Sequence, residues 1–228
     1  MTALLASVRN LAEAQQVAAC GVPWIDLKEP AEGALGAVPL GVVRDVVGQF
    51  GATHTVSATI GDCWDNPADI PVRVGVIAQA GVAYAKVGLY GHAPTAQMLA
   101  ALALAAECGC GVIAVCFAEA PPSLADLRQL ASTGIAGVML DTARKDGPGL
   151  GALLEPAQLQ AFVQGVAGLG LLCGLAGRLA SRDVPTLMAL GPDYLGFRSA
   201  LCAQAERVAS VDTVRVLALC RLFASSLK

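Results

Sequence analysis

The chain has 228 residues, of which 55% are hydrophobic, 4% aromatic and 14% charged, and its formal net charge is −3. This length suits one large core and is short for two, so we expect a single catalytic domain over residues 1–228. No apolar run reaches the length of a membrane span, and the charge provides no broad basic surface. Membranes and nucleic acid are therefore not expected partners.

Lysine is scarce among the basic residues. Eleven of the 15 basic residues are arginine, and the only lysines are Lys28, Lys86, Lys145 and Lys228. Both side chains carry a positive charge, but only lysine readily loses its proton when its surroundings change. The three internal lysines therefore indicate positions where a neutral amine has a chemical use.

Short apolar segments recur along the chain, each after a segment of helical character. We expect β-strands over 3–8, 22–28, 53–59, 83–89, 111–117, 135–141, 170–175 and 193–198. Glycines stand where the intervening helices should end, and glycine there is typical of a helix that ends on a residue in the left-handed conformation. These glycines are Gly21, Gly51, Gly81, Gly109, Gly134, Gly168 and Gly191. Eight strand–helix repeats in a chain of this length predict an α/β fold, a single-domain (β/α)8 TIM barrel. An open doubly wound sheet is disfavoured, because no G-x-G-x-x-G follows the first strand.

Charged residues gather at the ends of the even-numbered strands, where TIM barrels hold their active sites. The second strand ends Asp26-Leu-Lys28, and the two-residue period of a strand places Asp26 and Lys28 on one face. Lys86 lies near the end of the fourth strand, Asp141 ends the sixth, and Lys145 follows in the next loop. Because inward side chains of alternate strands share layers, we expect Lys28, Lys86 and Asp141 to converge.

This cluster suggests Schiff-base chemistry. Crowded ammonium groups disfavour one another's charged forms, and a partly dry barrel mouth adds desolvation, so one lysine can become a neutral amine near pH 7. Such an amine attacks an aldehyde or ketone, and the resulting iminium accepts electrons in enamine formation, aldol addition and elimination. Asp26 and Asp141 can hold a neighbouring ammonium or relay protons. A single Asp-x-Lys is more often a structural ion pair, but three lysines at strand ends favour catalysis.

Glycine-rich loops follow the seventh and eighth strands. Loops at these positions commonly bind phosphate in TIM barrels, since glycine lets backbone N–H groups approach the anion. We expect Gly177, Arg178, Gly196 and Ser199 to line a phosphate site, with Arg198 clamping the phosphate oxygens through two parallel hydrogen bonds. A small phosphorylated substrate is the expected partner.

The third strand offers weaker candidates for substrate contacts. Ser57 and Thr59 alternate toward the barrel interior, and Asp62 follows the strand. Hydroxyls in the core and an aspartate in a turn are an equally good interpretation.

The cysteines indicate a reducing compartment. There are eight, without a C-x-x-C pair or a secretory signal before them, and neither of the two histidines stands at ligand spacing. We expect free thiols in a cytoplasmic protein, with no metal and no cofactor. The high apolar content also favours a homo-oligomer.

At these residues the chain resembles the (5-formylfuran-3-yl)methyl phosphate synthase family, also called 4-(hydroxymethyl)-2-furancarboxaldehyde-phosphate synthase, of methanofuran biosynthesis. The resemblance covers nearly the whole chain. It is carried, in order, by the segments 26–30, 33–36, 57–62, 86–91, 139–147, 175–177 and 196–198. One departure is the segment 117–122, which is shorter than the family pattern and has Glu119 where the pattern leads us to expect aspartate.

The resemblance implies a Schiff-base lyase of C1 metabolism. It would condense two molecules of glyceraldehyde 3-phosphate into (5-formylfuran-3-yl)methyl phosphate, with release of phosphate and water. By position, Lys28 would form the Schiff base, Lys86 would transfer protons, and Asp26, Asp141 and Lys145 would complete the catalytic set. The residues alone leave three alternatives open: a class I aldolase, a phosphosugar isomerase, or a phosphosugar-binding protein without catalysis.

Overall fold

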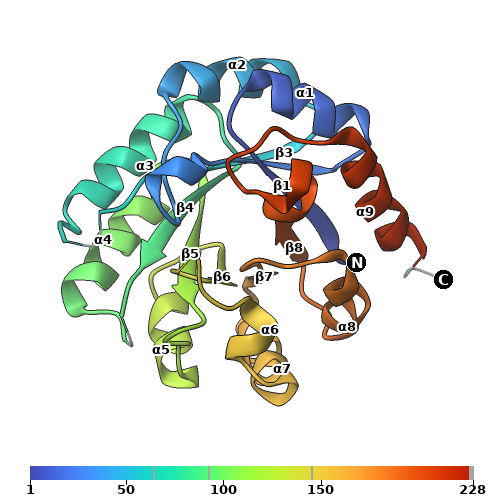
Figure 1. Cartoon of the computed structure of the whole chain (residues 1–228). Coiled ribbons are helices and arrows are strands. Elements are labelled where there is room, and N and C mark those ends of the chain that lie inside the picture. The colour runs from blue at the N-terminus through green and yellow to red at the C-terminus, as the bar shows by residue number, and fades with distance from the viewer. Residues whose placement is uncertain (64, 92, 145, 226–228) are drawn as a thin grey trace.

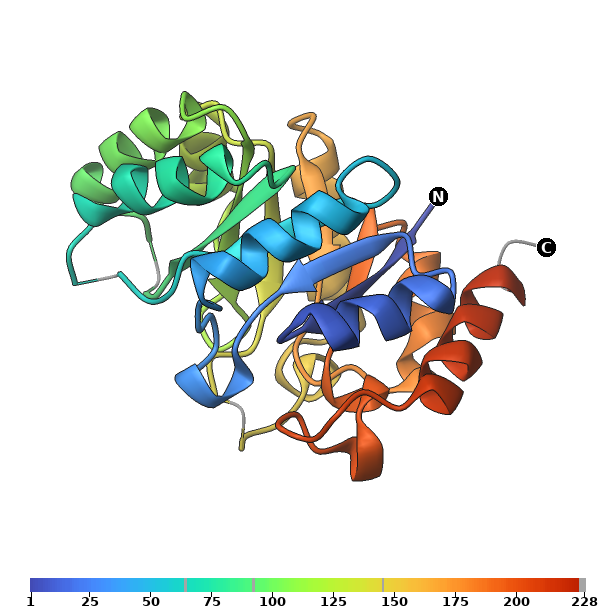
Figure 2. The same ribbon diagram turned by 90° about the horizontal axis from the view of Figure 1, so that it is seen from above.

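The protein is described by a computed structural model over residues 1–63, 65–91, 93–144 and 146–225. Eight parallel strands form a closed barrel in chain order, and the last strand pairs with the first. Figure 1 shows the helices arranged around this barrel, and Figure 2 gives the view turned by 90°. The strands are β1 (Ala3–Val8), β2 (Trp24–Leu27), β3 (Thr55–Thr59), β4 (Tyr84–Leu89), β5 (Gly111–Phe117), β6 (Gly137–Asp141), β7 (Leu172–Leu175) and β8 (Tyr194–Phe197). The expected TIM barrel is confirmed.

The helices lie between the strands in sequence, and their apolar sides pack on the outside of the barrel. They are α1 (Leu11–Ala19), α2 (Leu40–Phe50), α3 (Asp69–Gln79), α4 (Ala96–Ala106), α5 (Leu124–Ala131), α6 (Leu150–Leu153), α7 (Pro156–Ala167), α8 (Val184–Ala189) and α9 (Thr213–Ser225). Short 3-10 turns are η1 (Pro30–Glu32), η2 (Ser181–Asp183), η3 (Ser199–Leu201) and η4 (Ala203–Ala205). Within the described residues, no helix is both long and apolar enough to cross a membrane.

The expectation that each of these glycines ends a helix in the left-handed conformation is confirmed at most positions and wrong at two. Five of the seven glycines have positive φ, but Gly51 and Gly168 have φ of −59° and −64°. At Gly51 the reason for glycine is close packing, since a Cβ there would lie 2.7 Å from the carbonyl oxygen of Val47. After α7 the left-handed position is Gly170, with φ of +72°.

Aromatic rings fill the barrel interior below the strand ends. The Trp24 ring centroid lies 4.5 Å from that of Tyr194 and 5.1 Å from that of Tyr84. Glycines make the room, because a Cβ on Gly174 would lie only 2.2 Å from Cζ of Tyr194. The Tyr194 ring centroid is 5.6 Å from Lys86 Nζ, so this aromatic layer lies next to the charged residues of the strand ends.

Candidate active site

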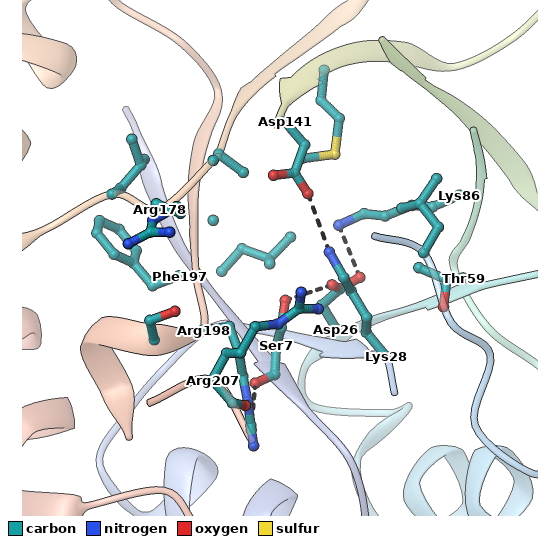
Figure 3. A pocket seen from close by; sticks show the side chains of 18 residues that line it. Ser7, Asp26, Lys28, Thr59, Lys86, Asp141, Arg178, Phe197, Arg198 and Arg207 are labelled. Atoms are coloured by element: carbon teal, nitrogen blue, oxygen red, sulfur yellow. Dashed lines mark hydrogen bonds and ion pairs between the residues drawn. The ribbon is translucent and has the colours of Figure 1, made fainter. Parts of the chain in front are cut away.

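A pocket at the carboxyl ends of the strands collects most of the residues expected at the site. Its lining includes both lysines and both aspartates of the expected cluster, the glycine loops after β7 and β8, and the arginines Arg178, Arg198 and Arg207 (Figure 3). The strand register explains the meeting, because Asp26, Lys86 and Asp141 belong to alternate strands of one closed barrel. Lys145 lies outside the described residues.

Lys86 and Asp26 form the deeper of two ion pairs. Lys86 Nζ lies 2.8 Å from Asp26 Oδ1, and both side chains are only 2% exposed. Ser7 Oγ donates to Asp26 Oδ2 at 2.8 Å, and Ser57 Oγ donates to Oδ1 at 2.6 Å. The carboxylate therefore accepts three hydrogen bonds, so both of its buried oxygens have partners.

The Trp24 indole fixes the direction of the bond from Ser57. Trp24 Nε1 donates to Ser57 Oγ at 3.0 Å. Since an indole N–H can only donate, Ser57 must accept that bond and give its own proton to Asp26. Ser57 is fully buried and serves Asp26 rather than facing the pocket.

Burial controls the proton affinity of Lys86. Burial lowers the pKa of Lys86, the carboxylate of Asp26 opposes this effect, and the nearby charge of Lys28 lowers the pKa further. The net result is a pKa below the ordinary lysine value of 10.5. Lys86 therefore releases its proton more easily than a surface lysine does.

Lys28 and Asp141 form the outer ion pair. Lys28 Nζ lies 3.1 Å from Asp141 Oδ2, with side chains 12% and 6% exposed. Lys28 immediately follows β2, and its backbone N–H still bonds the carbonyl of Val8 on β1. The backbone N–H of Thr142 donates to the other oxygen of Asp141 at 2.7 Å. Lys28 is thus anchored like a strand residue and is the more accessible of the two amines. The expected convergence of Lys28, Lys86 and Asp141 is confirmed as geometry.

The other candidates from β3 do not turn polar groups toward the pocket. Thr59 lines it, but its hydroxyl donates to the carbonyl of Gly36 at 2.7 Å. Asp62 is exposed, lies outside the lining and accepts a 2.7 Å bond from the Tyr90 hydroxyl. The structural interpretation of Ser57 and Thr59 therefore fits the described contacts better than direct substrate binding.

The glycine loops after β7 and β8 do line the pocket. Gly177, Arg178, Gly196 and Ser199 are all among its lining residues. Gly177 has φ of +103°, and a Cβ there would lie 2.7 Å from Thr142 Cγ2, so only glycine fits without displacement. Arg178 also takes a left-handed conformation, with φ of 53°.

The expected phosphate clamp by Arg198 is wrong. Its guanidinium meets the carboxylate of Glu13 through two bonds, Nη1 to Oε2 at 2.6 Å and Nη2 to Oε1 at 3.2 Å. The remaining donors bond the carbonyls of Ser7, Arg207 and Ala209 at 2.7–3.1 Å. Because all five N–H donors of the guanidinium already have protein acceptors, none is left for a phosphate.

Sequence reasoning also missed Arg207 and the role of Glu119. Arg207 lies in irregular chain after η4, where neither periodicity nor a strand end marks it. The carboxylate of Glu119 accepts the backbone N–H groups of Ala143 and Arg144, both at 3.0 Å. The segment after β5 thus holds the loop after β6.

Nothing described suggests a metal centre. Among the residues that the structure covers, no group of three or more His, Cys, Asp and Glu side chains is arranged to hold a metal ion. The amines and carboxylates of the pocket can supply a nucleophile and proton transfers by themselves.

Solved structures and sequence relatives agree with this description. Phosphoribosyl anthranilate isomerase from Thermotoga maritima has a TM-score of 0.71 at 12% identity, covering 99% of this chain and 100% of that one. KGPDC from Streptococcus mutans has a TM-score of 0.70 at 11% identity, covering 100% of each chain. At such identities these likenesses concern the fold alone.

Fold and pocket together define a TIM-barrel protein with two lysine–carboxylate pairs at its strand ends. The chain belongs to the 4-HFC-P synthase family, whose sequence profile matches residues 4–220. It is therefore an enzyme of a synthase family.

Two relatives show how close the match is. The (5-formylfuran-3-yl)methyl phosphate synthase of Methanopyrus kandleri is 34% identical over 217 residues, covering 90% of this chain and 91% of the relative. A protein of Methylorubrum extorquens, provisionally named for the same synthase, is 40% identical over 213 residues, covering 93% and 88%.

Proposed function

We propose that this enzyme is a Schiff-base lyase that condenses two molecules of glyceraldehyde 3-phosphate into (5-formylfuran-3-yl)methyl phosphate, with release of phosphate and water. Its setting would be the biosynthesis of methanofuran or a close analogue. Family membership supports the product, since the relative in Methanopyrus kandleri bears the name of this synthase. The observation that carries the mechanism is the presence of two lysines, each paired with its own carboxylate, in one pocket.

Lys28 is the nucleophile of the proposal. It is the more exposed amine and lies beside Asp141. Loss of a proton frees the amine to attack the carbonyl carbon of one triose phosphate, and loss of water then gives the iminium. Asp141 would take the proton from Lys28 and return it to the hydroxyl that leaves as water, and its carboxylate, ionised again, would then stabilise the positive iminium.

Lys86 handles the next proton. Its lowered pKa, caused by burial, suits an amine that alternates between the two protonation states. Removal of a proton from the carbon next to the iminium gives an enamine, which attacks the aldehyde carbon of the second triose phosphate. Asp26, held by Ser7 and Ser57, keeps Lys86 in place during both steps.

Ring closure, dehydration and loss of one phosphate complete the furan, and hydrolysis of the iminium releases the aldehyde and regenerates the Lys28 amine. Asp141 and Lys145 are proposed to assist proton removal and to stabilise the leaving phosphate. The glycine loops with Arg178 and Ser199 would bind phosphate through backbone N–H groups and side chains. No organic cofactor or metal enters these steps.

Reductive trapping tests the nucleophile. The enzyme is incubated with glyceraldehyde 3-phosphate and borohydride, and the modified peptide is mapped by mass spectrometry. We expect a stable adduct on Lys28, absent in Lys28→Arg. An adduct on another lysine would reassign the nucleophile, and failure to trap any lysine would exclude the Schiff-base mechanism.

Product analysis separates the proposal from its rivals. The synthase should release free phosphate and form a product with furan ultraviolet absorbance. A class I aldolase would give an open-chain sugar phosphate with no free phosphate, an isomerase would interconvert one substrate, and a binding protein would give no product.

The cellular setting is a proposal as well. All eight cysteines are free thiols, which supports a cytoplasmic location. Exposed apolar side chains on α3 and α4, including Val72 and Leu104, support a homo-oligomer. Light scattering of the purified enzyme tests the second point, and a monomeric mass would contradict it.

A further inference from the structure

Arg207 has the features expected of an anion-binding side chain. It lines the same pocket as Lys28 and Asp141, and Figure 3 shows it extending into that pocket. It is half-buried, and among the described residues its guanidinium has one hydrogen-bond acceptor, the carbonyl of Gly33 at 2.8 Å from Nη2. The other donors of this fork remain available to a ligand, in contrast with those of Arg198.

The loop that carries Arg207 is tightly held. Cys202 and Val211 pair in an antiparallel bridge, and the Ala203 N–H bonds the carbonyl of Ser210 at 3.1 Å. Gln204 has φ of 54° within this loop, a conformation that non-glycine residues adopt only where the surroundings enforce it. Arg207 is therefore presented on a fixed support.

Arg198 is part of this support. It donates to the backbone carbonyl of Arg207 at 2.7 Å and to that of Ala209 at 2.9 Å. Its guanidinium is in turn fixed by Glu13, which is 4% exposed. Glu13 and Arg198 thus connect the start of α1 to the loop of Arg207.

The contact with Gly33 places Arg207 on the Lys28 side of the pocket. Gly33 belongs to the segment between β2 and α2, and the N–H of Glu29, next to Lys28, bonds the carbonyl of Gly36 in the same segment. Arg207 therefore bridges the loop after β8 to the loop that begins at Lys28. An anion held there would lie on the side of the pocket that Lys28 lines.

We propose that Arg207 binds the phosphate of the triose phosphate that is attached to Lys28, and that Arg198 and Glu13 are positioning residues for Arg207. This inference rests on the proposed function for the identity of the substrate. A planar guanidinium suits two phosphate oxygens at once, which a lysine at this position would not match.

Phosphate preference in the trapping reaction provides the main test. Borohydride trapping on Lys28 is compared between glyceraldehyde 3-phosphate and unphosphorylated glyceraldehyde, for the wild type and Arg207→Met. We expect the variant to lose about tenfold or more of the preference for the phosphorylated aldehyde. If Arg207 only supports Gly33, both aldehydes will be trapped more slowly by the same factor, and the proposal is overturned.

Matched variants control for charge and folding. Arg221→Met removes an exposed arginine of α9 and should leave the preference unchanged. Arg207→Lys keeps the positive charge but loses the planar guanidinium, which can bond two phosphate oxygens at once. Its preference for the phosphorylated aldehyde should therefore fall between those of the wild type and Arg207→Met.

A double-mutant cycle tests the positioning role. Calorimetric titration with inorganic phosphate is carried out on Arg198→Lys, Arg207→Met and the double variant. If Arg198 acts through Arg207, the double variant should bind phosphate no more weakly than Arg207→Met. Additive losses would mean that Arg198 contributes independently and would overturn its positioning role.

The same titration separates two kinds of failure. Phosphate binding requires no reactive amine, so it can be measured even if no lysine is trapped. Weaker phosphate binding by Arg207→Met, without trapping in the wild type, would reject the Schiff-base function and retain Arg207 as the anion ligand. Trapping on Lys28 with an unchanged phosphate preference in Arg207→Met would retain the Schiff-base function and reject Arg207 as the anion ligand.

Discussion

The buried pair of Lys86 and Asp26 makes a measurable claim about stability. Replacing Lys86 by methionine keeps most of the side-chain volume but leaves the Asp26 carboxylate buried without its cation, since both side chains are 2% exposed. Removing one partner of a buried ion pair costs about 3–5 kcal/mol. Ser7 and Ser57 still donate to the carboxylate at 2.8 and 2.6 Å, so we expect a loss near the lower end, about 3 kcal/mol.

Urea denaturation at pH 8 measures this loss by linear extrapolation. The double variant Lys86→Met/Asp26→Asn removes both charges and should recover about 2 kcal/mol relative to Lys86→Met. A midpoint for Lys86→Met equal to that of the wild type would refute the reasoning, because it would mean that the carboxylate is not held as a buried ion.

The pH dependence of the same variants has a defined sign. Because burial holds the pKa of Lys86 below 10.5, the folded state binds fewer protons than the unfolded state between the folded-state pKa and 10.5. Wild-type stability should therefore contain a component that rises with pH across that window and levels off above it, and Lys86→Met should lack it. A Lys86→Met curve parallel to that of the wild type would contradict the lowered pKa.

Three further outcomes are expected. Lys28→Arg and Lys86→Arg should keep the circular dichroism of the fold and lose nearly all furan formation. Because lysine is scarce in this chain, we expect the same loss of activity in Lys145→Arg. Lys228→Arg should change almost nothing. Tyr194→Phe should raise stability by about 1 kcal/mol, because the buried Tyr194 hydroxyl has no hydrogen-bond partner among the described residues, and a loss in urea denaturation would show that it has one. Burial raises the pKa of Glu13, but Arg198 and Arg9 outweigh this effect and bring the pKa below 4.5. Glu13 therefore stabilises the fold above pH 4.5 and loses this contribution as the pH falls through its folded-state pKa. In Glu13→Gln, the free energy of unfolding should fall less steeply as the pH is lowered below 4.5.

Much of the site could be predicted from two periodicities. The two-residue strand period put Asp26 and Lys28 on one face, and the strand–helix repeat put Lys86 and Asp141 at the same end of the barrel. Both signals are local or depend only on topology, so a single sequence contains them. The depth of each lysine was not predictable, because it depends on which side chains cover it.

The arginines show where such reasoning fails. Arg198 sits at a strand end in the pattern expected of a phosphate ligand, yet its bidentate partner is Glu13, which lies 185 residues away in the chain. Whether a strand-end arginine faces a ligand or a buried carboxylate depends on packing in three dimensions. Arg207 lies in an irregular segment, whose position is set by the bridge between Cys202 and Val211 rather than by any periodic pattern.

The contrast between these arginines and the lysines fits the proposed use of lysine at two strand ends. Among the described residues, Lys28 and Lys86 each have one acceptor, so either amine can exchange its partner when its proton leaves. All the guanidinium donors of Arg198 are engaged by protein acceptors, which suits a fixed support. An arginine at position 86 would bring five donors to a site where Asp26 already accepts two serine hydroxyls, and it would supply no neutral amine. In the proposed mechanism, Lys28 and Lys86 therefore stand where a proton has to move, while Arg198 stands in a support that holds its place.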